Sequence, residues 1–459
     1  MHPAAHWRKL VAAGLAVFLM GAAGTRPPIV DATRDGDSAA LRALIEKEAD
    51  VNATEADGST ALLWASYRDD LSSADLLIRA GANANQANDL GATPLWAASQ
   101  NGSLPMVSRL LAAGANPNAA LLSGETPLMV AARSGYPEVV RALAGKDANL
   151  NARGARGQTA LMWAVAENHP DVVKTLLALG ADIKVRSEVW NEVMAVPPHG
   201  YLEYNRAITH GGETALLFAA RVGGLASAKL LVDVGANVND QDAWGVSATV
   251  LAAHSDFADF VAFLLEKGSD PNAAQAGFTA LHEAIMQRDE KMVAALLDHG
   301  ADPNAPLRTW TPTRRSSHDF HFEPALVGAT PFWLAARSSE PNVMRMLVKH
   351  GADPLFVLHA DYLTEGYRHR TEATTSLMAA TGMGGGGAWV QPPRGQREAL
   401  ALDTVKLAVE LGVDLNAANT DGRTALDGAK ALRYDSVVKF LVEKGARPGR
   451  PAQQATDEK

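Results

Sequence analysis

Six histidines gather in three short segments of the chain, and they are the residues whose type best suits chemistry. The segments hold His199 and His210, His318 and His321, and His359 and His369. Acidic residues stand close by, namely Asp319, Glu323, Asp361 and Glu365. Imidazole and carboxylate groups together can bind a divalent metal, and the spacing His318-x-x-His321 suits two ligands of one ion. The sequence does not set the distances between the segments, so solvated or mutually hydrogen-bonded loop histidines are the other interpretation. We assign no metal site.

The same three segments are rich in large aromatic rings. They hold Trp190, Tyr201 and Tyr204, then Trp310, Phe320 and Phe322, then Phe356, Tyr362 and Tyr367. Polar surface loops do not need so many rings. Either the rings pack each segment down as a small core, or some stay exposed as anchors for a partner, because aromatic side chains supply much of the binding energy of interfaces.

The known catalytic motifs are missing from the sequence. It contains no His-Glu-x-x-His, no Gly-x-Ser-x-Gly and no nucleotide-binding Gly-Lys-Ser/Thr pattern. The glycine run 384–387 follows no expected strand and precedes no lysine, so we interpret it as a flexible loop and not as a phosphate cradle. We assign no catalytic residue and no cofactor.

A repeat makes up the rest of the chain and must position these segments. A Thr, or Ser in one copy, opens each unit at Thr60, Thr93, Thr126, Thr159, Thr214, Ser247, Thr279, Thr330, Thr375 and Thr424. The first four are spaced by 33 residues, and a fixed period of this size predicts a solenoid. The Thr can cap a first helix, and Gly114 and its equivalents can end a second helix in the left-handed conformation. Asp147 takes the place of this glycine in the third repeat.

The opening of each unit resembles that of the ankyrin repeat, Thr-Pro-Leu-His-x-Ala-Ala. Thr93-Pro-Leu-Trp-Ala-Ala98 and Thr279-Ala-Leu-His-Glu-Ala284 carry the resemblance, which covers residues 28 to 447. It implies an all-α solenoid of helix-turn-helix units with finger loops or hairpins between successive units. It also implies a protein that recognises another protein and is not an enzyme, since the family rarely carries catalytic groups.

The repeat spacing divides the chain into segments. We expect a signal peptide at 1–24, a capping repeat at 25–58, the repeat array at 59–447 and a disordered tail at 448–459. Insertions are expected in the fingers near 185–212, 305–329 and 355–373, and between the two helices of the ninth repeat near 382–399. The resemblance places the three finger insertions on one side of the solenoid.

The N-terminal segment predicts export. Arg8 and Lys9 precede an apolar run of 14 residues, Leu10 to Ala23, that ends in small residues. We expect cleavage after Gly24 and a periplasmic or secreted protein. An uncleaved anchor is the alternative, although the run falls short of the roughly 20 residues that span a bilayer. No other segment predicts a membrane span.

Composition narrows the chemistry and the partners further. The chain has no cysteine, which excludes disulfides and thiolate metal sites. Its net charge of -9 argues against a nucleic-acid partner, because neutralising phosphates requires a basic surface.

Inner-helix positions complete the surface that we expect to bind a partner. The variable fifth position of the ankyrin unit should face the concave groove and holds Trp64, Trp163, Phe218 and Glu283, and the eighth holds Tyr67, Arg133, Arg221 and Arg337. The insertions add Trp190, Tyr204, Trp310, Phe320 and Tyr362. Trp96 and Trp333, one position before the fifth, are expected to be structural.

We predict a cell-envelope module that binds an unknown protein in the groove and enlarged fingers. The alternative is a solenoid, with or without enzymatic activity, whose aromatic and His-rich insertions hold a small molecule or metal.

Overall fold

The computed structural model describes residues 26–194, 206–311, 321–364, 368–387 and 389–450. The chain divides into two compact units, Met1–Val185 and Arg186–Lys459, which we term unit 1 and unit 2. Outside the described residues lie the expected signal peptide, most of the expected tail, and His199, Tyr201, Tyr204, His318, Asp319, Phe320, Glu365 and Tyr367. Within the described part, no helix is long and apolar enough to cross a bilayer.

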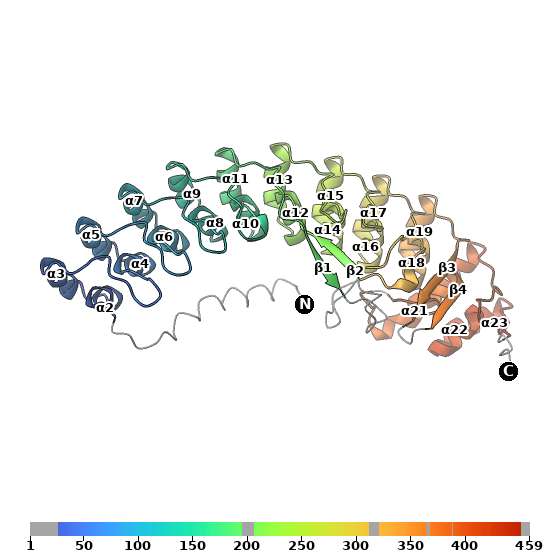
Figure 1. Ribbon diagram of the computed structural model, residues 1–459. Helices are drawn as coiled ribbons and strands as arrows, with labels where there is room; N and C mark the ends of the chain where they lie inside the picture. Colours follow the sequence, from blue (N-terminus) through green and yellow to red (C-terminus); the bar gives the residue numbers. More distant parts are fainter. Residues whose placement is uncertain (1–25, 195–205, 312–320, 365–367, 388, 451–459) are drawn as a thin grey trace. The chain divides into compact units, whose positions relative to one another are not determined.

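Unit 1 is a stack of helix pairs. Its elements are α2 (Pro28–Asp35), α3 (Ser38–Glu46), α4 (Ala61–Tyr67), α5 (Leu71–Arg79), α6 (Pro94–Asn101), α7 (Leu104–Ala112), α8 (Pro127–Arg133), α9 (Pro137–Ala144), η4 (Ala155–Gly157), α10 (Ala160–Ala166) and α11 (Pro170–Ala178). The first helix of each pair, the inner helix, packs on neighbouring inner helices, and the second, the outer helix, packs on outer helices (Figure 1). Leu95, Leu110 and Leu128 lie between the layers and are at most 1% exposed. Stacking is required because one pair cannot bury its own apolar face.

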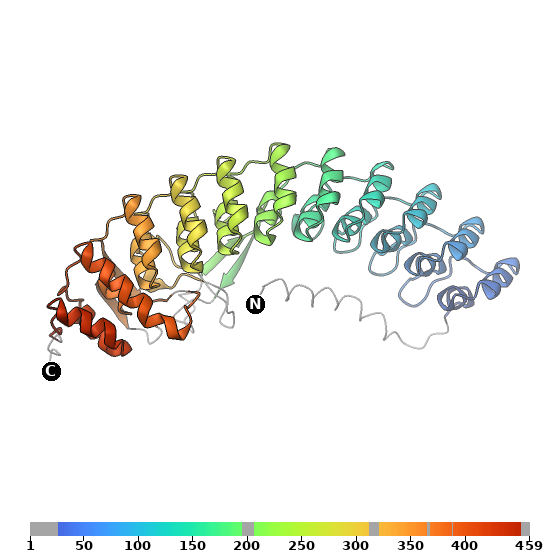
Figure 2. The ribbon, with the colours of Figure 1, turned by 180° about the vertical axis from the view of Figure 1, so that it is seen from behind.

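Unit 2 continues the same pattern with additional elements. Its helices are α12 (Ala215–Val222), α13 (Leu225–Asp233), α14 (Ala248–His254), α15 (Ala258–Glu266), α16 (Ala280–Gln287), α17 (Glu290–Asp298), α18 (Pro331–Arg337), α19 (Pro341–Lys349), α20 (Ser376–Ala380), α21 (Arg397–Glu410), α22 (Ala425–Leu432) and α23 (Asp435–Glu443). Two short 3-10 helices, η6 (Pro324–Leu326) and η7 (Arg394–Gln396), lie in the inserted segments. Figure 2 shows the helix pairs of each unit from behind.

Two antiparallel hairpins stand in unit 2. Strand β1 (Trp190–Met194) pairs with β2 (Arg206–His210), and β3 (Val357–Leu363) pairs with β4 (His369–Thr375). In β3–β4, Tyr362 is opposite Arg370 and Ala360 is opposite Glu372. The expected fold class, helix-turn-helix units with finger loops and hairpins, is confirmed.

The residues that mark the repeat act as the sequence predicts. The Thr60 hydroxyl accepts a hydrogen bond from the Leu63 backbone N–H at 3.1 Å and so caps α4. Gly114 follows the second helix at φ 85°, and Asp147 takes the same left-handed conformation at φ 64°. Trp333, expected to be structural, is fully buried, and its Nε1 donates to the Thr374 carbonyl oxygen at 3.2 Å.

Asparagine side chains join successive repeats in a ladder along the finger bases. The Asn118 Oδ1 accepts from the Asn149 N–H at 2.7 Å, and its Nδ2 donates to the Asp147 carbonyl oxygen at 3.0 Å. Asn304 does the same in unit 2, where its Oδ1 accepts from the Asp353 N–H at 2.8 Å. Each ladder bond satisfies a backbone group between two helix pairs and fixes their spacing.

Candidate functional site

The inner face of unit 1 carries a cluster of rings and charges around Trp64. The Arg34 guanidinium lies 4.9 Å from the centre of the Trp64 ring, and Trp64 Nε1 donates to Glu55 Oε2 at 3.2 Å. Tyr67, at the C-terminus of α4, packs edge-on against Trp64 with the ring centres 5.9 Å apart, and it is 44% exposed. The cluster therefore presents the exposed ring of Tyr67 beside the half-buried ring of Trp64.

A second cation–aromatic pair lies further along unit 1. Arg133 stands 5.5 Å from the centre of the half-buried Trp163 ring and pairs with Glu125 at 2.8 Å. Burial raises the pKa of Glu125, and the charge of Arg133 opposes this shift. Unit 2 repeats the pair, since Arg221 binds Glu213 across the same spacing of eight residues. Arg133 and Arg221 thus already have carboxylate partners within the chain.

The fifth position of the inner helix is more buried than the sequence predicted. Phe218 is 8% exposed and Glu283 is 2% exposed, so the expectation that both face an open groove is wrong. Ala97 and Val130, at the same position in unit 1, are 2% and 0% exposed. This position lies between stacked inner helices, and in unit 1 only the large Trp64 and Trp163 stay half exposed there.

In unit 2, the inserted segments of the chain cover inner-helix residues. Trp389, from the insertion of the ninth repeat, packs on Phe322 with ring centres 4.9 Å apart and edge-on against His254 at 5.6 Å. His254 Nδ1 lies 3.0 Å from Glu283 Oε2, and burial raises the pKa of Glu283. Trp389 Nε1 donates to the His321 carbonyl oxygen at 2.6 Å. Glu283, which the sequence placed in an open groove, therefore interacts with His254 of the same chain and does not face a partner.

Arg337 also makes its interactions within the chain. Its guanidinium donates to the carbonyl oxygen of Gly386 in the insertion, and burial lowers its pKa. Its expected role in an open groove is not supported, because it holds the insertion of the ninth repeat against α18.

The glycine run is tightly packed, which differs from the flexible loop expected from the sequence. A Cβ atom at Gly384 would lie 2.8 Å from the Trp333 ring, and one at Gly386 would lie 2.6 Å from the Leu326 side chain. Gly384 and Gly386 also have φ values of 78° and 73°. The run is made of glycine because the backbone passes directly against other side chains in conformations that glycine adopts without strain.

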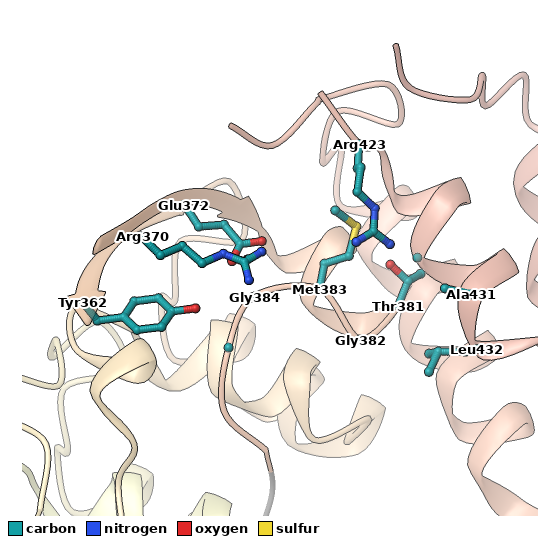
Figure 3. A pocket seen from close by; sticks show the side chains of 12 residues that line it. Tyr362, Arg370, Glu372, Thr381, Gly382, Met383, Gly384, Arg423, Ala431 and Leu432 are labelled. Atoms are coloured by element: carbon teal, nitrogen blue, oxygen red, sulfur yellow. The ribbon is translucent and has the colours of Figure 1, made fainter. Parts of the chain in front are cut away.

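A cavity of about 210 Å³ opens beside this run in unit 2 (Figure 3). One wall comes from hairpin β3–β4, with Tyr362, Arg370 and Glu372, and another from Arg423 and the middle and C-terminal end of α22. Gly384 and Gly385 line it between these walls. Burial raises the pKa of the Tyr362 hydroxyl, so it stays a hydrogen-bond donor at neutral pH.

Comparison with known families identifies the repeat. A model described as "Ankyrin repeats (3 copies)" matches residues 29–120, 114–187 and 216–306, and a model described as "Ankyrin repeat" matches residues 327–357. The chain belongs to the ankyrin-repeat family. Ankyrin repeats are generally modules of protein–protein interaction and typically non-enzymatic binding scaffolds.

A solved structure similar to this ankyrin-repeat chain is the ankyrin repeat domain of human ASB11. The two share 29% sequence identity, and the match covers 54% of this chain and 100% of the human domain, with a TM-score of 0.44.

The described histidines of the ankyrin fingers mostly serve their own hairpins. His210 is opposite Trp190 across β1–β2 and stacks on it at 4.4 Å, and its Nε2 lies 3.7 Å from Glu192. His369 Nε2 lies 3.1 Å from Asp361 across β3–β4. Within the described residues, no three His, Asp or Glu side chains gather as metal ligands.

The finger aromatics divide between packing and partial exposure. Phe322 is fully buried and packs against Phe278 with ring centres 5.4 Å apart. For this ring, the interpretation that the rings pack each segment as a small core holds. Trp190, Trp310 and Tyr362 are half-buried. Tyr204 and Phe320 lie outside the described residues.

Two exposed leucines on the finger turns of unit 1 were missed in the sequence. Leu90 is 56% exposed and Leu122 is 81% exposed, and the Leu122 N–H donates to the Leu90 carbonyl oxygen at 3.0 Å. The turns of neighbouring ankyrin repeats are therefore joined, and each carries an apolar side chain in solvent. The signal was present, because Leu90 stands where the preceding turn has Asp57, and Leu122 stands where the turn before it has Asp89.

Proposed function

We propose that this ankyrin-repeat protein is exported to the cell envelope and binds a protein partner through the inner face and finger turns of unit 1. The joined turns of Leu90 and Leu122 carry the proposal. Single exposed leucines are ordinary on protein surfaces, whereas two on adjacent hydrogen-bonded turns form a patch. Such a patch favours a partner that buries an apolar side chain.

The inner face of unit 1 supplies the second part of the surface. Tyr67 is exposed, and Trp163 is half-buried beside Arg133. Tyr, Trp and Arg are the residue types enriched among those that dominate binding energy. The partner we propose is a protein segment with apolar side chains that contact the turns and inner helices together.

Substitution of the two leucines tests this surface. Leu90→Ser with Leu122→Ser should leave the melting temperature nearly unchanged, because exposed positions usually alter stability by no more than about 0.5 kcal/mol. Binding should weaken strongly. The measurement places a photo-reactive amino acid at position 122 in the native host and quantifies cross-linked protein with and without Leu90→Ser.

The matched control uses Val234 of unit 2, which is 53% exposed. A cross-linker there, and Val234→Ser, should neither capture nor release the protein cross-linked at position 122. Equal capture at both positions would show non-specific adhesion and remove the proposed surface.

Export is tested separately. The apolar run before Gly24 favours cleavage there, so N-terminal sequencing of the exported protein should begin at or near Thr25. Recovery of the chain with an intact Met1 in the membrane fraction would favour the anchor instead.

A further inference from the structure

The cavity beside β3–β4 contains a cation that its surroundings do not neutralise. Arg370 is shared between two carboxylates, since its Nη2 lies 3.5 Å from Glu372 and 3.4 Å from Asp421. Arg423 on the facing wall makes no ion pair with any described residue, and Figure 3 shows its guanidinium directed toward Thr381 and Met383. Arg423 is exposed to solvent, so this wall of the cavity carries a positive charge without a carboxylate partner among the described residues.

Two glycines whose backbone N–H groups are not used by the described part of the fold, Gly384 and Gly385, line the same cavity. No acceptor within the described residues binds the N–H groups of Gly384 and Gly385. Gly385 lies so close to Ala325 that a Cβ atom would clash, so this part of the wall carries no side chain at position 385. Helix α22 is equally close, since a Cβ atom at Gly428 would lie 2.6 Å from Thr381 Oγ1. Bare backbone N–H groups near a guanidinium are the donors that bind oxyanions.

The carboxylate in the cavity does not oppose this use. Glu372 is 6% exposed, its Oε1 accepts from Asn419 Nδ2 at 3.1 Å, and Arg370 stands beside its Oε2. The charge of Glu372 is therefore compensated by Asn419 and Arg370 of the same chain. The remaining donors are Arg423, the two glycine N–H groups and the Tyr362 hydroxyl, which lies near Gly385.

The volume sets the size of the ligand. At roughly 30 Å³ for each water molecule, a cavity of about 210 Å³ holds the equivalent of about seven waters. Pockets for drug-sized ligands start at about 300 Å³. A small metabolite fits this space.

We propose that this cavity binds a small carboxylate, with the planar guanidinium of Arg423 pairing with its two oxygens. The fork of an arginine matches a carboxylate in two parallel hydrogen bonds. A monoanion balances the one unpaired cation, while a doubly charged phosphate would leave excess negative charge near Glu372 and Asp421. This site is independent of protein binding by unit 1.

Calorimetric titration of the full mature chain tests the proposal with acetate, lactate, succinate, benzoate and inorganic phosphate as probes. At least one carboxylate should bind saturably with one site per chain, and phosphate should bind more weakly. Arg423→Ala should weaken that carboxylate at least tenfold, and Arg423→Lys should weaken it less because the charge remains. Arg394→Ala removes an exposed arginine outside the cavity and should have no effect.

Three results would overturn the proposal. They are the absence of saturable carboxylate binding at millimolar concentrations, tighter binding of phosphate than of every carboxylate, and equal affinities of the unaltered chain and Arg423→Ala. Circular dichroism of each variant confirms that it folds. If Arg423→Ala fails to fold, Arg423→Lys against Arg394→Lys gives the same comparison. Partner cross-linking at position 122 of unit 1 is measured without these probes, so the two proposals fail separately.

Discussion

Unit 1 and unit 2 are built from the same repeat but place their polar side chains differently. In unit 1, the ring and charge clusters at Trp64 and Trp163 are half-exposed on inner helices. In unit 2, Glu283 is 2% exposed and lies against His254, and Arg337 is bound to the insertion of the ninth repeat. The difference shows that an insertion in one repeat can turn the inner face of preceding repeats into interior.

Individual repeats also differ at the position that precedes the second helix. Asp70 begins α5 in unit 1, where its Oδ1 accepts from the Ser73 N–H at 3.1 Å. Glu340 holds the equivalent place before α19 and makes no capping bond. Arg288 lies 3.8 Å from it but donates to the carbonyl oxygens of Ser338 and Ser339. Neither Glu340 carboxyl oxygen has a hydrogen-bond partner within the described residues.

The largest effect we expect separates a buried ring from a half-exposed one at the same repeat position. Phe218→Ala in unit 2 should reduce the free energy of unfolding by about 3–5 kcal/mol, because it leaves a cavity between stacked helices. Trp163→Ala in unit 1 should cost about 1–2 kcal/mol, since it loses partial burial and the contact with Arg133. Denaturant unfolding measures both, and equal losses would contradict the assignment of Trp163 to the surface.

Sequence reasoning recovered what depends on local structure. Thr60 caps a helix, Gly114 ends one and Asp147 replaces that glycine, because each role is decided within a few residues of the chain. Periodicity then gives the fold, since each repeat needs only its neighbours.

What the sequence did not reveal depends on contacts between segments without a common period. Trp389 meets His254 and Phe322 from a loop that lies far along the chain. No spacing rule predicts where such a loop turns. For that reason Glu283 and Arg337 were expected in an open groove, and the cavity around Arg423 was not foreseen.

Glu340 should make the stability of the folded chain depend on pH. Burial raises the pKa of this carboxyl from 4.5 to about 8, with Arg288 opposing the shift and Glu290 adding to it. The folded chain therefore keeps a proton that the unfolded chain releases above pH 4.5, so stability from this group is complete below pH 4.5 and is lost as pH rises to 8. Glu340→Gln should abolish this loss and stabilise the chain at pH 8 by on the order of 2–4 kcal/mol.

Urea unfolding at several pH values measures the difference between the two proteins. Glu410→Gln, at an exposed position of α21, is the matched control and should leave the pH dependence unchanged. If the free energy of unfolding of Glu340→Gln fell by the same amount between pH 4.5 and 8, the decline would come from other groups.

The smallest effect concerns the asparagine ladder, which is interrupted where another residue replaces the asparagine. Leu355 stands at the ladder position of the eighth repeat, where Asn118 stands in the second, and it is 57% exposed. The Asp414 N–H, which corresponds to the Asn149 N–H, makes no hydrogen bond with any described residue. Asn118→Leu should cost about 1 kcal/mol, the usual net value of an intramolecular hydrogen bond.

The reciprocal change, Leu355→Asn, should add a bond and stabilise the last repeats by about 0.5–1 kcal/mol, because an exposed bond lies at the low end of that range. Native-state hydrogen exchange reads each change at one amide: Asn149 should exchange faster in Asn118→Leu, and Asp414 more slowly in Leu355→Asn. The packing of α19 on α21 brings the two repeats into contact, so the new amide has a partner within reach. Unchanged exchange at Asp414 would mean that the eighth and ninth repeats are spaced differently at this turn, and that the interruption of the ladder reflects geometry as well as the identity of one side chain.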